Sequence, residues 1–496
     1  MTSPRSRSLI GMILLGIFLF ASSSVNTLVH AEGRPNILWI VGENFSNDLG
    51  CYGQQNVATP HLDQLAADGI RFVNAFSTSP VCAPSRSCFM TGMYQTTTDT
   101  HHMRSHRDDG YRLPPGVRPL THWLKDVGYF TANITHLGDE RTGTGKLDLN
   151  YVNEGPLYDT SQWNELKSHQ PFYAQINLPE AEYDIYDRKS SEKKRVPWVG
   201  EEWHPQVATE QNVTPPPFYP DHPIVKQEWA RYLNSVSGAD VRVGKILEHL
   251  KRDGLEKDTI VFFFADNGRL TVRGIHWPFD QGLRVPLIVR DAPNHSFFAE
   301  NENAGTVSQR VVSLLDLTAT TLKCAGIEPP LGMQSRVFLG KNADQPRRYA
   351  FAARDRIDET VIRMRSVHDE RFHYIRNFSP GAGLESLNRY KEKCFLVMPL
   401  LRELKQEGLL SGPALEMMQP FPEEMLFDTR EDPHEIHNLL PAKSPEHQEA
   451  LIRLQAALET WIVETGDRGG IPEPPGVVEP FTKEMHDWFG TPDWAR

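Results

Sequence analysis

The residues best suited to chemistry lie in a short segment that runs from Val81 to Cys88. Cys82 is followed two residues later by Pro84, which suits the first turn of a helix because its missing N–H is not needed there. Cys82 is therefore expected at a helix N-terminus, where free backbone N–H groups and the helix dipole favour an anion. Arg86 adds a guanidinium that matches the oxygens of a sulfate or phosphate ester. The segment could hold a nucleophile beside an anion site, or Cys82 could be a buried structural cysteine before an ordinary helix.

Two pairs of oxygen-bearing residues follow the two most apolar runs of the chain. Residues 36–41 and 259–264 are runs typical of strands buried on both faces of a parallel sheet. Glu43-Asn44 comes after the first run and Asp266-Asn267 after the second. Open α/β sheets bind ligands at the carboxyl ends of their strands. These oxygen donors suit a hard cation, and Ca²⁺ is favoured over Mg²⁺ because its geometry is more tolerant, although each pair alone could be a cap or turn former.

The elements around these residues alternate between strands and helices. The pattern predicts strands at 36–41, 70–76, 129–132, 171–178, 259–264 and 285–289, and helices at 60–68, 120–127, 228–251 and 313–322. Beyond about residue 330 the predicted elements are short strands at 363–367, 372–375 and 426–428, a helix at 445–463 and a proline-rich tail. We therefore expect an α/β domain with a mostly parallel sheet flanked by helices (32–330), and a smaller α+β subdomain with an antiparallel sheet (331–496).

Composition and the N-terminal segment limit the possible partners. The formal net charge of −12 argues against nucleic-acid binding and against a stable membrane partner, so an anionic substrate would need a local basic pocket. Residues 1–31 have the basic, apolar and small-residue regions of a signal peptide, which predicts a secreted or periplasmic protein; an uncleaved anchor is the alternative. Five cysteines leave at least one thiol without an internal disulfide partner, and Cys82 is the candidate with a chemical task.

Several motifs in a fixed order resemble those of the formylglycine-dependent sulfatases of the alkaline phosphatase superfamily. They are Arg34-Pro35-Asn36, Asp48-Leu49-Gly50, Thr59-Pro60-His61, Cys82-Ala83-Pro84-Ser85-Arg86, Asp266-Asn267-Gly268 and Phe427-Asp428-Thr429. The resemblance spans residues 34–465 and implies an alkaline-phosphatase-like fold. Within the family, the residues after Asp428 and the ending at 461–465 most resemble heparan N-sulfatase (N-sulfoglucosamine sulfohydrolase).

The resemblance implies a specific chemistry. A formylglycine-generating enzyme would recognise the Cys82 motif and convert this cysteine to formylglycine, whose hydrated aldehyde attacks the sulfur while a general acid protonates the leaving group. Arg86 would fix the hydrate, and a divalent cation would lower the pKa of the nucleophile. The implied metal ligands are Glu43, Asn44, Cys82, Asp266 and Asn267.

The chain departs from the family pattern at several of these positions. The usual Asp-Asp metal pair is Glu43-Asn44, which has one formal charge fewer and predicts weaker binding of the cation. The family's lysine corresponds to Lys146 if a gap is allowed, and His136 takes its place if it is not. The family's His-x-Pro-His is Pro179-Glu180-Ala181-Glu182 here, which removes a histidine for leaving-group chemistry. His276 is then the best candidate for the missing acid.

A histidine-rich loop after the nucleophile segment could contact the substrate. His101, His102 and Arg104 could bind hydroxyl, carboxylate or sulfate groups, or the loop could simply be solvated. Residues 354–359 could likewise contact substrate or form an ion-paired surface segment. The leading hypothesis is a sulfatase acting on a sulfated carbohydrate such as a glycosaminoglycan. The alternatives are a phosphodiesterase or phosphonate monoester hydrolase, and a catalytically silent protein that binds sulfated glycans.

Overall fold

The computed structural model describes residues 33–106, 109–182 and 200–495 of the chain. The predicted signal peptide at 1–31 lies outside these residues. Residues 183–199, between the predicted strand at 171–178 and the predicted helix at 228–251, also lie outside them. None of the described helices combines the length and the apolarity needed to cross a membrane.

A large mixed sheet forms the centre of the molecule. Its order in the described residues is β4-β3-β6-β1-β7-β8-β2-β9, with β5 paired to β3. The strands are β1 (Asn36–Gly42), β2 (Ile70–Phe76), β3 (Phe130–Leu137), β4 (Glu140–Arg141), β5 (Thr160–Gln162), β6 (Phe172–Leu178), β7 (Thr259–Ala265), β8 (Leu287–Arg290) and β9 (Thr306–Ser313). The pairs β1–β6, β1–β7, β3–β5, β3–β6 and β2–β9 are parallel, whereas β8 is antiparallel to both of its neighbours. The sheet is therefore mostly parallel, as predicted.

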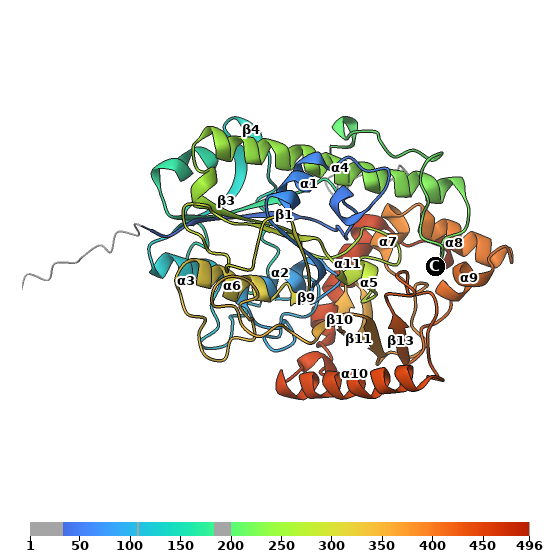
Figure 1. Cartoon of the computed structure of the whole chain (residues 1–496). Helices are drawn as coiled ribbons and strands as arrows, with labels where there is room; N and C mark the ends of the chain where they lie inside the picture. Colours follow the sequence, from blue (N-terminus) through green and yellow to red (C-terminus); the bar gives the residue numbers. More distant parts are fainter. Residues whose placement is uncertain (1–32, 107–108, 183–199, 496) are drawn as a thin grey trace, which may run out of the picture.

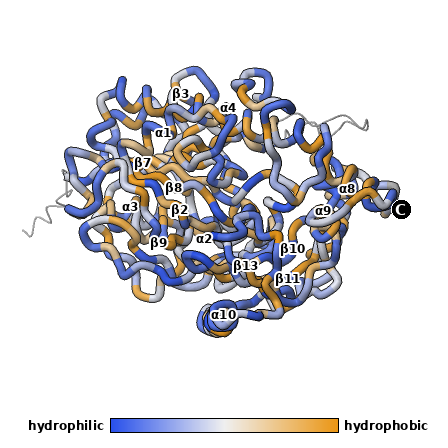
Figure 2. Tube along the Cα trace, turned by 45° about the vertical axis from the view of Figure 1, so that its right-hand side comes forward, coloured by the Kyte–Doolittle hydropathy of each residue, from blue (hydrophilic) through white to orange (hydrophobic). Residues whose placement is uncertain are grey.

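Helices cover both faces of this sheet, with α1 and α4 on one side and α2, α3 and α6 on the other (Figure 1). Their bounds are α1 (Pro60–Ala67), α2 (Cys82–Thr91), α3 (Leu120–Asp126), α4 (Pro223–Arg252), α5 (Asp280–Leu283) and α6 (Asp316–Cys324). Because both faces are covered, β1, β6 and β7 are buried along their whole length. The hydrophobic colouring of the central strands in Figure 2 follows from this burial.

A second, antiparallel sheet lies beside the first and consists of β10 (Ala350–Ile357), β11 (Thr360–His368), β12 (Phe372–Asn377) and β13 (Glu424–Asp428). The helices of this part are α7 (Arg389–Cys394), α8 (Val397–Gln406), α9 (Gly412–Met417), α10 (Pro445–Glu464) and α11 (Pro475–Phe489). Helix α10 lies along β11 and β12 at the edge of the molecule (Figure 1). The Ser444 side chain caps α10 by accepting a hydrogen bond from the backbone N–H of His447.

Three parts of the prediction differ from the structure. The long helix α4 begins at Pro223 rather than at 228, because the His222 side chain caps it by accepting the Ile224 N–H, and Pro223 suits its first turn. The proline-rich tail contains helix α11, since Pro475 lies in the first turn of that helix. Residues 354–359 are not a surface segment, because Arg354, Asp355 and Arg356 are buried in β10. The five cysteines are all free thiols.

Candidate active site

The two pairs of oxygen-bearing residues meet at one edge of the large sheet. Strands β1 and β7 are parallel neighbours in which Gly42 lies opposite Ala265, so the residues that follow each strand are adjacent. The Asn267 side-chain amide donates a hydrogen bond to Asn44 Oδ1 at 2.9 Å, and the Asn44 backbone N–H donates to Asp266 Oδ1 at 3.3 Å. Glu43, Asn44, Asp266 and Asn267 are all buried. The register of two strands thus brings together residues more than 220 positions apart.

Cys82 is the first residue of α2 and lies beside these ligands. Val81 before it has an extended backbone, which starts the helix at the position predicted from Pro84. The Ser85 hydroxyl donates to the Asp266 carbonyl at 2.6 Å and so ties the first turn of α2 to the end of β7. The thiol is buried, and this burial raises the pKa of Cys82 well above its usual value despite the nearby Lys146. An unmodified Cys82 would therefore be a neutral thiol.

Arg86 connects three strands beneath the cavity. Its Nε donates to Asp266 Oδ2 at 2.9 Å, its Nη1 donates to Asn177 Oδ1 at 2.8 Å, and its Nη2 lies 3.4 Å from Glu43 Oε1. Burial alone would lower the pKa of Arg86, but Asp266 and Glu43 outweigh it and the net shift is upward. Arg86 is therefore a permanent buried cation that orients the acidic side chains around it. Asn177, on β6, is a partner that the motif analysis did not identify.

The structure places Lys146, and not His136, beside Cys82. Lys146 Nζ lies 2.8 Å from Glu43 Oε2 and 2.5 Å from Glu182 Oε1. Burial lowers the pKa of Lys146, but nearby acidic groups, including Glu182 and Glu43, shift it upward overall. His136 instead lies on β3, where its Nδ1 is 2.8 Å from the Thr135 hydroxyl, and it does not line the cavity described below. Of the two alternatives, the geometry favours Lys146.

The donor set beside Cys82 fits a hard cation. Asn267 Oδ1 is a buried oxygen without a hydrogen-bond partner, and Glu43 Oε1 has only the ion-pair contact with Arg86 at 3.4 Å, so a bound ion would satisfy both. The surrounding donors are all carboxylate and amide oxygens, which Ca²⁺ and Mg²⁺ prefer. Burial and the adjacent Glu182 raise the pKa of Glu43 well above its usual value, although Lys146 and Arg86 lower it. Lys146 and Arg86 therefore do not fully balance the negative charge of this cluster, and an additional cation would stabilise the ionised form of Glu43.

A cavity of about 60 Å³ opens above these residues. Asn44, Cys82 and Lys146 line its floor, and the other polar lining residues are Arg104, Asp148, Glu182, His276, Asp358 and Tyr390. Glu182 belongs to Pro179-Glu180-Ala181-Glu182, which stands in place of the family's His-x-Pro-His. Of the two carboxylates in this segment, the one of Glu182 lines the cavity. The other, Glu180, is buried in an ion pair with Arg242.

Backbone strain is concentrated around this cavity. Ten non-glycine residues of the described chain have a positive φ, and five of them line the cavity with φ between 46° and 76°. These five are Asn44, Arg104, Asp148, His276 and Asp358. Each such conformation costs about 1–3 kcal/mol and persists only where surrounding contacts enforce it, which is typical of functional sites.

The predicted substrate-binding and acid residues are only partly brought together. His276 lines the cavity, and its carbonyl accepts a hydrogen bond from Arg354 Nε at 2.8 Å. Burial, together with Lys391, Arg354 and Arg104, lowers the pKa of His276 well below its usual value. Arg104 also lines the cavity. His101 and His102 do not line it, although both are buried in the same loop.

His102 supports the loop rather than facing the cavity. Its Nδ1 accepts the backbone N–H of Arg356 at 3.2 Å, and its carbonyl accepts the Asn150 side-chain amide at 2.7 Å. The Arg356 side chain donates to the Met103 carbonyl at 3.1 Å. These contacts fix the backbone at His102 and Met103 and so position Arg104, which follows Met103 in the chain. The loop is therefore neither solvated nor a set of three substrate contacts.

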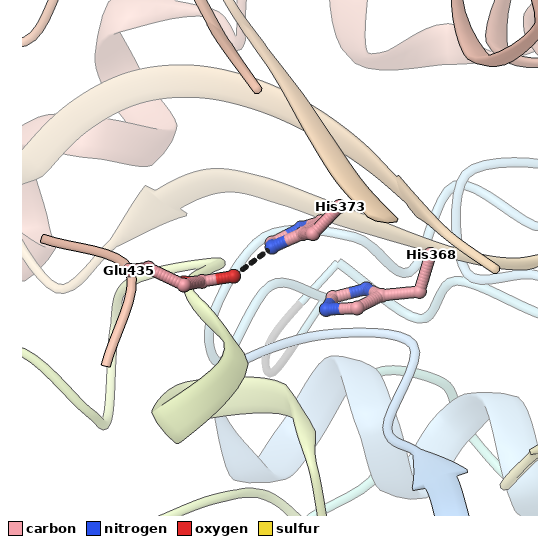
Figure 3. A group of neighbouring side chains, drawn as sticks. All are labelled: His368, His373 and Glu435. Carbon is pink, nitrogen blue, oxygen red and sulfur yellow. Dashed lines mark hydrogen bonds and ion pairs between the residues drawn. The ribbon is translucent and has the colours of Figure 1, made fainter. Parts of the chain in front are cut away.

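A second group of potential metal ligands lies between the two sheets (Figure 3). His368, His373 and Glu435 are buried and close together, and His373 hydrogen-bonds to Glu435. The two imidazole rings stack with centroids 3.4 Å apart and planes 17° from parallel. Their lone pairs lie in nearly parallel planes and do not converge on one point. Glu435 also accepts the backbone N–H of Asp280 at 2.8 Å, so the group connects the C-terminal sheet to α5.

The sequence reasoning missed the residues that cover the cavity. Tyr390 of α7 and Met485, Trp488 and Phe489 of α11 line its outer side. No motif marks these residues. For the three residues of α11, the only signal is the spacing of apolar side chains in the segment after Pro475.

Comparison with known proteins identifies similar sequences over most of the chain. The family model described as Sulfatase matches residues 35–327. An ulvan-active sulfatase of Formosa agariphila is 33% identical over 89% of this chain and 76% of the relative. The human N-sulphoglucosamine sulphohydrolase is 27% identical over 90% of this chain and 94% of its own length.

A solved structure shows the same fold at lower identity. It contains the substrate D-glucosamine-2-N,6-O-disulfate and superposes with a TM-score of 0.58 at 16% identity, covering 88% of this chain and 99% of the other. The predicted alkaline-phosphatase-like architecture, with a large α/β sheet and a smaller antiparallel sheet, is confirmed.

Proposed function

This chain belongs to the sulfatase family and is a sulfuric ester hydrolase, and we propose that it removes sulfate from a carbohydrate with Cys82 as the precursor of its nucleophile. One observation carries the proposal. Cys82, at the start of a helix, shares a cavity with Asn44 and Lys146, directly above a buried cluster of oxygen ligands. The same cavity offers the sulfate positive charge from Lys146 and backbone N–H groups from α2.

Related proteins support a sulfated carbohydrate as the substrate. One relative is named an ulvan-active sulfatase, another an N-sulphoglucosamine sulphohydrolase, and a protein of the same fold binds a glucosamine that carries N- and O-sulfate. The polar lining of the cavity is compatible with this class, because carboxylates such as Asp148 and Asp358 can accept hydrogen bonds from sugar hydroxyls.

Two groups would complete the site. A formylglycine at position 82 would supply an oxygen nucleophile, and Ca²⁺, or Mg²⁺ as the alternative, held by Glu43, Asn44, Asp266 and Asn267 together with residue 82, would supply positive charge beside it. A formylglycine-generating enzyme would be the partner that installs the modification, and the Cys82-x-Pro84-Ser85-Arg86 motif supports this.

The protein's own side chains would then perform separate tasks. Arg86 holds the carboxylate of Asp266 in place, as its two contacts at 2.9 Å indicate. Lys146 donates hydrogen bonds to the sulfate oxygens from the cavity floor. His276 is the histidine among the residues that line the cavity, which makes it the candidate for a leaving-group role. Burial keeps its imidazole neutral in the free protein, so it would donate a proton to the departing oxygen or nitrogen only after the negative charge of a bound sulfate has favoured the imidazolium.

We also propose that the protein acts outside the cytoplasm, secreted or periplasmic. The support is the signal-peptide pattern of residues 1–31, which lies outside the described residues.

Mass spectrometry of the protein from its native host tests the proposal. The tryptic peptide of residues 72–86 contains Cys82, and we expect the mass of formylglycine in place of the thiol. A panel of sulfated saccharides with free-sulfate detection gives the activity, with Cys82→Ala as the inactive control. A thiol in all of the material, or hydrolysis of aryl phosphonates faster than aryl sulfates, would contradict the proposal.

A further inference from the structure

Helix α11 forms the outer wall of the active-site cavity. Met485, Trp488 and Phe489, all on this helix, line the same cavity as Cys82, although more than 400 residues separate them along the chain. Figure 1 shows α11 beside α7 and within the outline of the molecule. Met485 is 1% exposed, so the helix is packed against the body of the protein.

The segment is fixed in front of α11 by an ion pair. Glu473 pairs with the fully buried guanidinium of Arg356, and the contact between Arg356 Nη2 and Glu473 Oε1 is 3.0 Å. The same guanidinium donates to the carbonyls of Met103 and Asp358, which flank or line the cavity. The ring of Phe481 lies 4.2 Å from this guanidinium. One arginine thus positions the Arg104 loop, Asp358 and the start of α11 together.

A second set of contacts fixes the other end of the helix. Arg389 Nη2 donates to the Thr491 hydroxyl at 3.3 Å, and the ring of Phe489 lies 5.9 Å from that of Tyr390. Trp488 is half-buried and lies 5.8 Å from the guanidinium of Arg104. Among the described residues, the Arg104 guanidinium has no hydrogen-bond or ion-pair partner in the protein. Its donors are therefore available to oxygens of a substrate.

We propose that α11 restricts this enzyme to the end of a saccharide chain. The sulfated terminal sugar enters the cavity with its ring against Trp488, and Arg104 donates hydrogen bonds to its oxygen substituents. The proposal rests on the sulfatase activity proposed above and specifies which sugar of a chain that site accepts.

The position of α11 on the cavity carries this inference. An enzyme that cuts sulfate from internal sugars needs a groove open at both ends, so that the chain can continue on either side. Here Met485, Trp488 and Phe489 line the cavity, and the chain is held at both ends of their helix, so α11 bounds the cavity where a longer chain would have to continue. The cavity of about 60 Å³ is smaller than the roughly 300 Å³ at the lower end of ligand pockets, so a sugar enters only if these side chains move apart.

Two trisaccharides test the restriction directly. One carries its sulfate on a terminal sugar and the other carries the same sulfate on the central sugar. The wild-type enzyme should release terminal sulfate at least about tenfold faster, a ratio within the range that pocket shape enforces in other enzymes. Replacing Met485, Trp488 and Phe489 together by alanine should reduce this ratio, whether α11 stays helical or detaches. Equal rates for the two trisaccharides with the wild-type enzyme would overturn the proposal.

A single substitution tests the role of Trp488. In Trp488→Ala, kcat/KM for the terminally sulfated saccharide should fall by about thirtyfold, as for other aromatic anchors, and the loss for a small aryl sulfate should be much smaller. His486→Ala, on the exposed side of the same helix, is the matched control and should behave as wild type. Equal losses on both substrates would indicate a merely structural role and would overturn the assignment. A wild-type enzyme without activity on either substrate would instead contradict the sulfatase proposal itself.

Discussion

Replacing Arg86 with lysine removes a guanidinium that contacts three strand ends at once. Arg86 donates to Asp266 and Asn177 at 2.9 and 2.8 Å, and its Nη2 lies 2.9 Å from Asp266 and 3.4 Å from Glu43. Lysine keeps the charge, but a single ammonium cannot reach all of these side chains in a fixed planar geometry. The substitution therefore tests whether geometry, rather than charge alone, organises the site.

The expected losses follow from the burial of these groups. The Arg86 and Asp266 side chains are 1% and 0% exposed, so solvent cannot replace the missing contacts. Arg86→Lys should lower the free energy of unfolding by about 1–3 kcal/mol, because the lysine keeps the charge but leaves buried acceptors such as Asn177 Oδ1 without a donor. The kcat/KM for an aryl sulfate should fall by at least about a hundredfold, as when one preorganised donor is removed from an active site.

Arg347→Lys is the matched control. Arg347 makes a similar two-pronged contact with the buried Asp316, with both distances at 2.6 Å, but it does not line the active-site cavity. Guanidinium denaturation measures stability, and free-sulfate release at a temperature where both variants are folded measures activity. Arg347→Lys should lose comparable stability and keep its turnover. Wild-type turnover in Arg86→Lys, or an equal loss of turnover in both variants, would refute the reasoning.

Three further predictions concern the cation, the lysine and the buried histidines. Chelation should lower the activity and should lower the free energy of unfolding by about 2.7 kcal/mol if the ion was present at a hundred times its Kd, which lowers the melting temperature. Ca²⁺ should restore both, and an unchanged melting temperature would argue against the oxygen-ligand site. Lys146→Met should abolish most sulfate release while His136→Gln should not, and the reverse result would favour the rejected alternative. Burial lowers the pKa of His102, His276 and His368, so the unfolded chain binds more protons than the folded one below about pH 6.5. The stabilisation that comes from keeping these histidines neutral should be fully present above that pH. Below it, the free energy of unfolding should fall by about 1.4 kcal/mol per pH unit for each histidine, and the slope should be shallower in His276→Gln. Thermal unfolding across this pH range measures the slope.

Much of the fold could be predicted because its signals are local. The runs at 36–41 and 259–264 contain the residues that form β1 and β7, since strands buried on both faces must be apolar along their length. Pro84 marked the first turn of α2, and Cys82 is the first residue of that helix. The floor of the site follows from the same reasoning, because residues after parallel neighbouring strands meet at one edge.

The walls of the site could not be predicted in this way. Arg104, Asp148, His276 and Asp358 adopt positive φ values. Asp and His tolerate this conformation better than most residues, but the sequence does not mark which of them adopt it, and the surrounding packing enforces it. The choice between Lys146 and His136 depended on a gap in the motif. Position in space favours Lys146, because its ammonium lies 2.8 Å from Glu43 Oε2.

The sequence by itself determined the candidates for the floor of the site: the Cys82 helix start, the two oxygen pairs and the order of motifs that mark a sulfatase. Each of these rests on neighbouring residues or on strand ends, so local chemistry is sufficient to identify them. Only the tertiary structure decided what covers that floor. Helix α11 reaches the cavity through Glu473 and Arg356, 117 residues apart, and a contact between such distant side chains leaves no pattern along the chain.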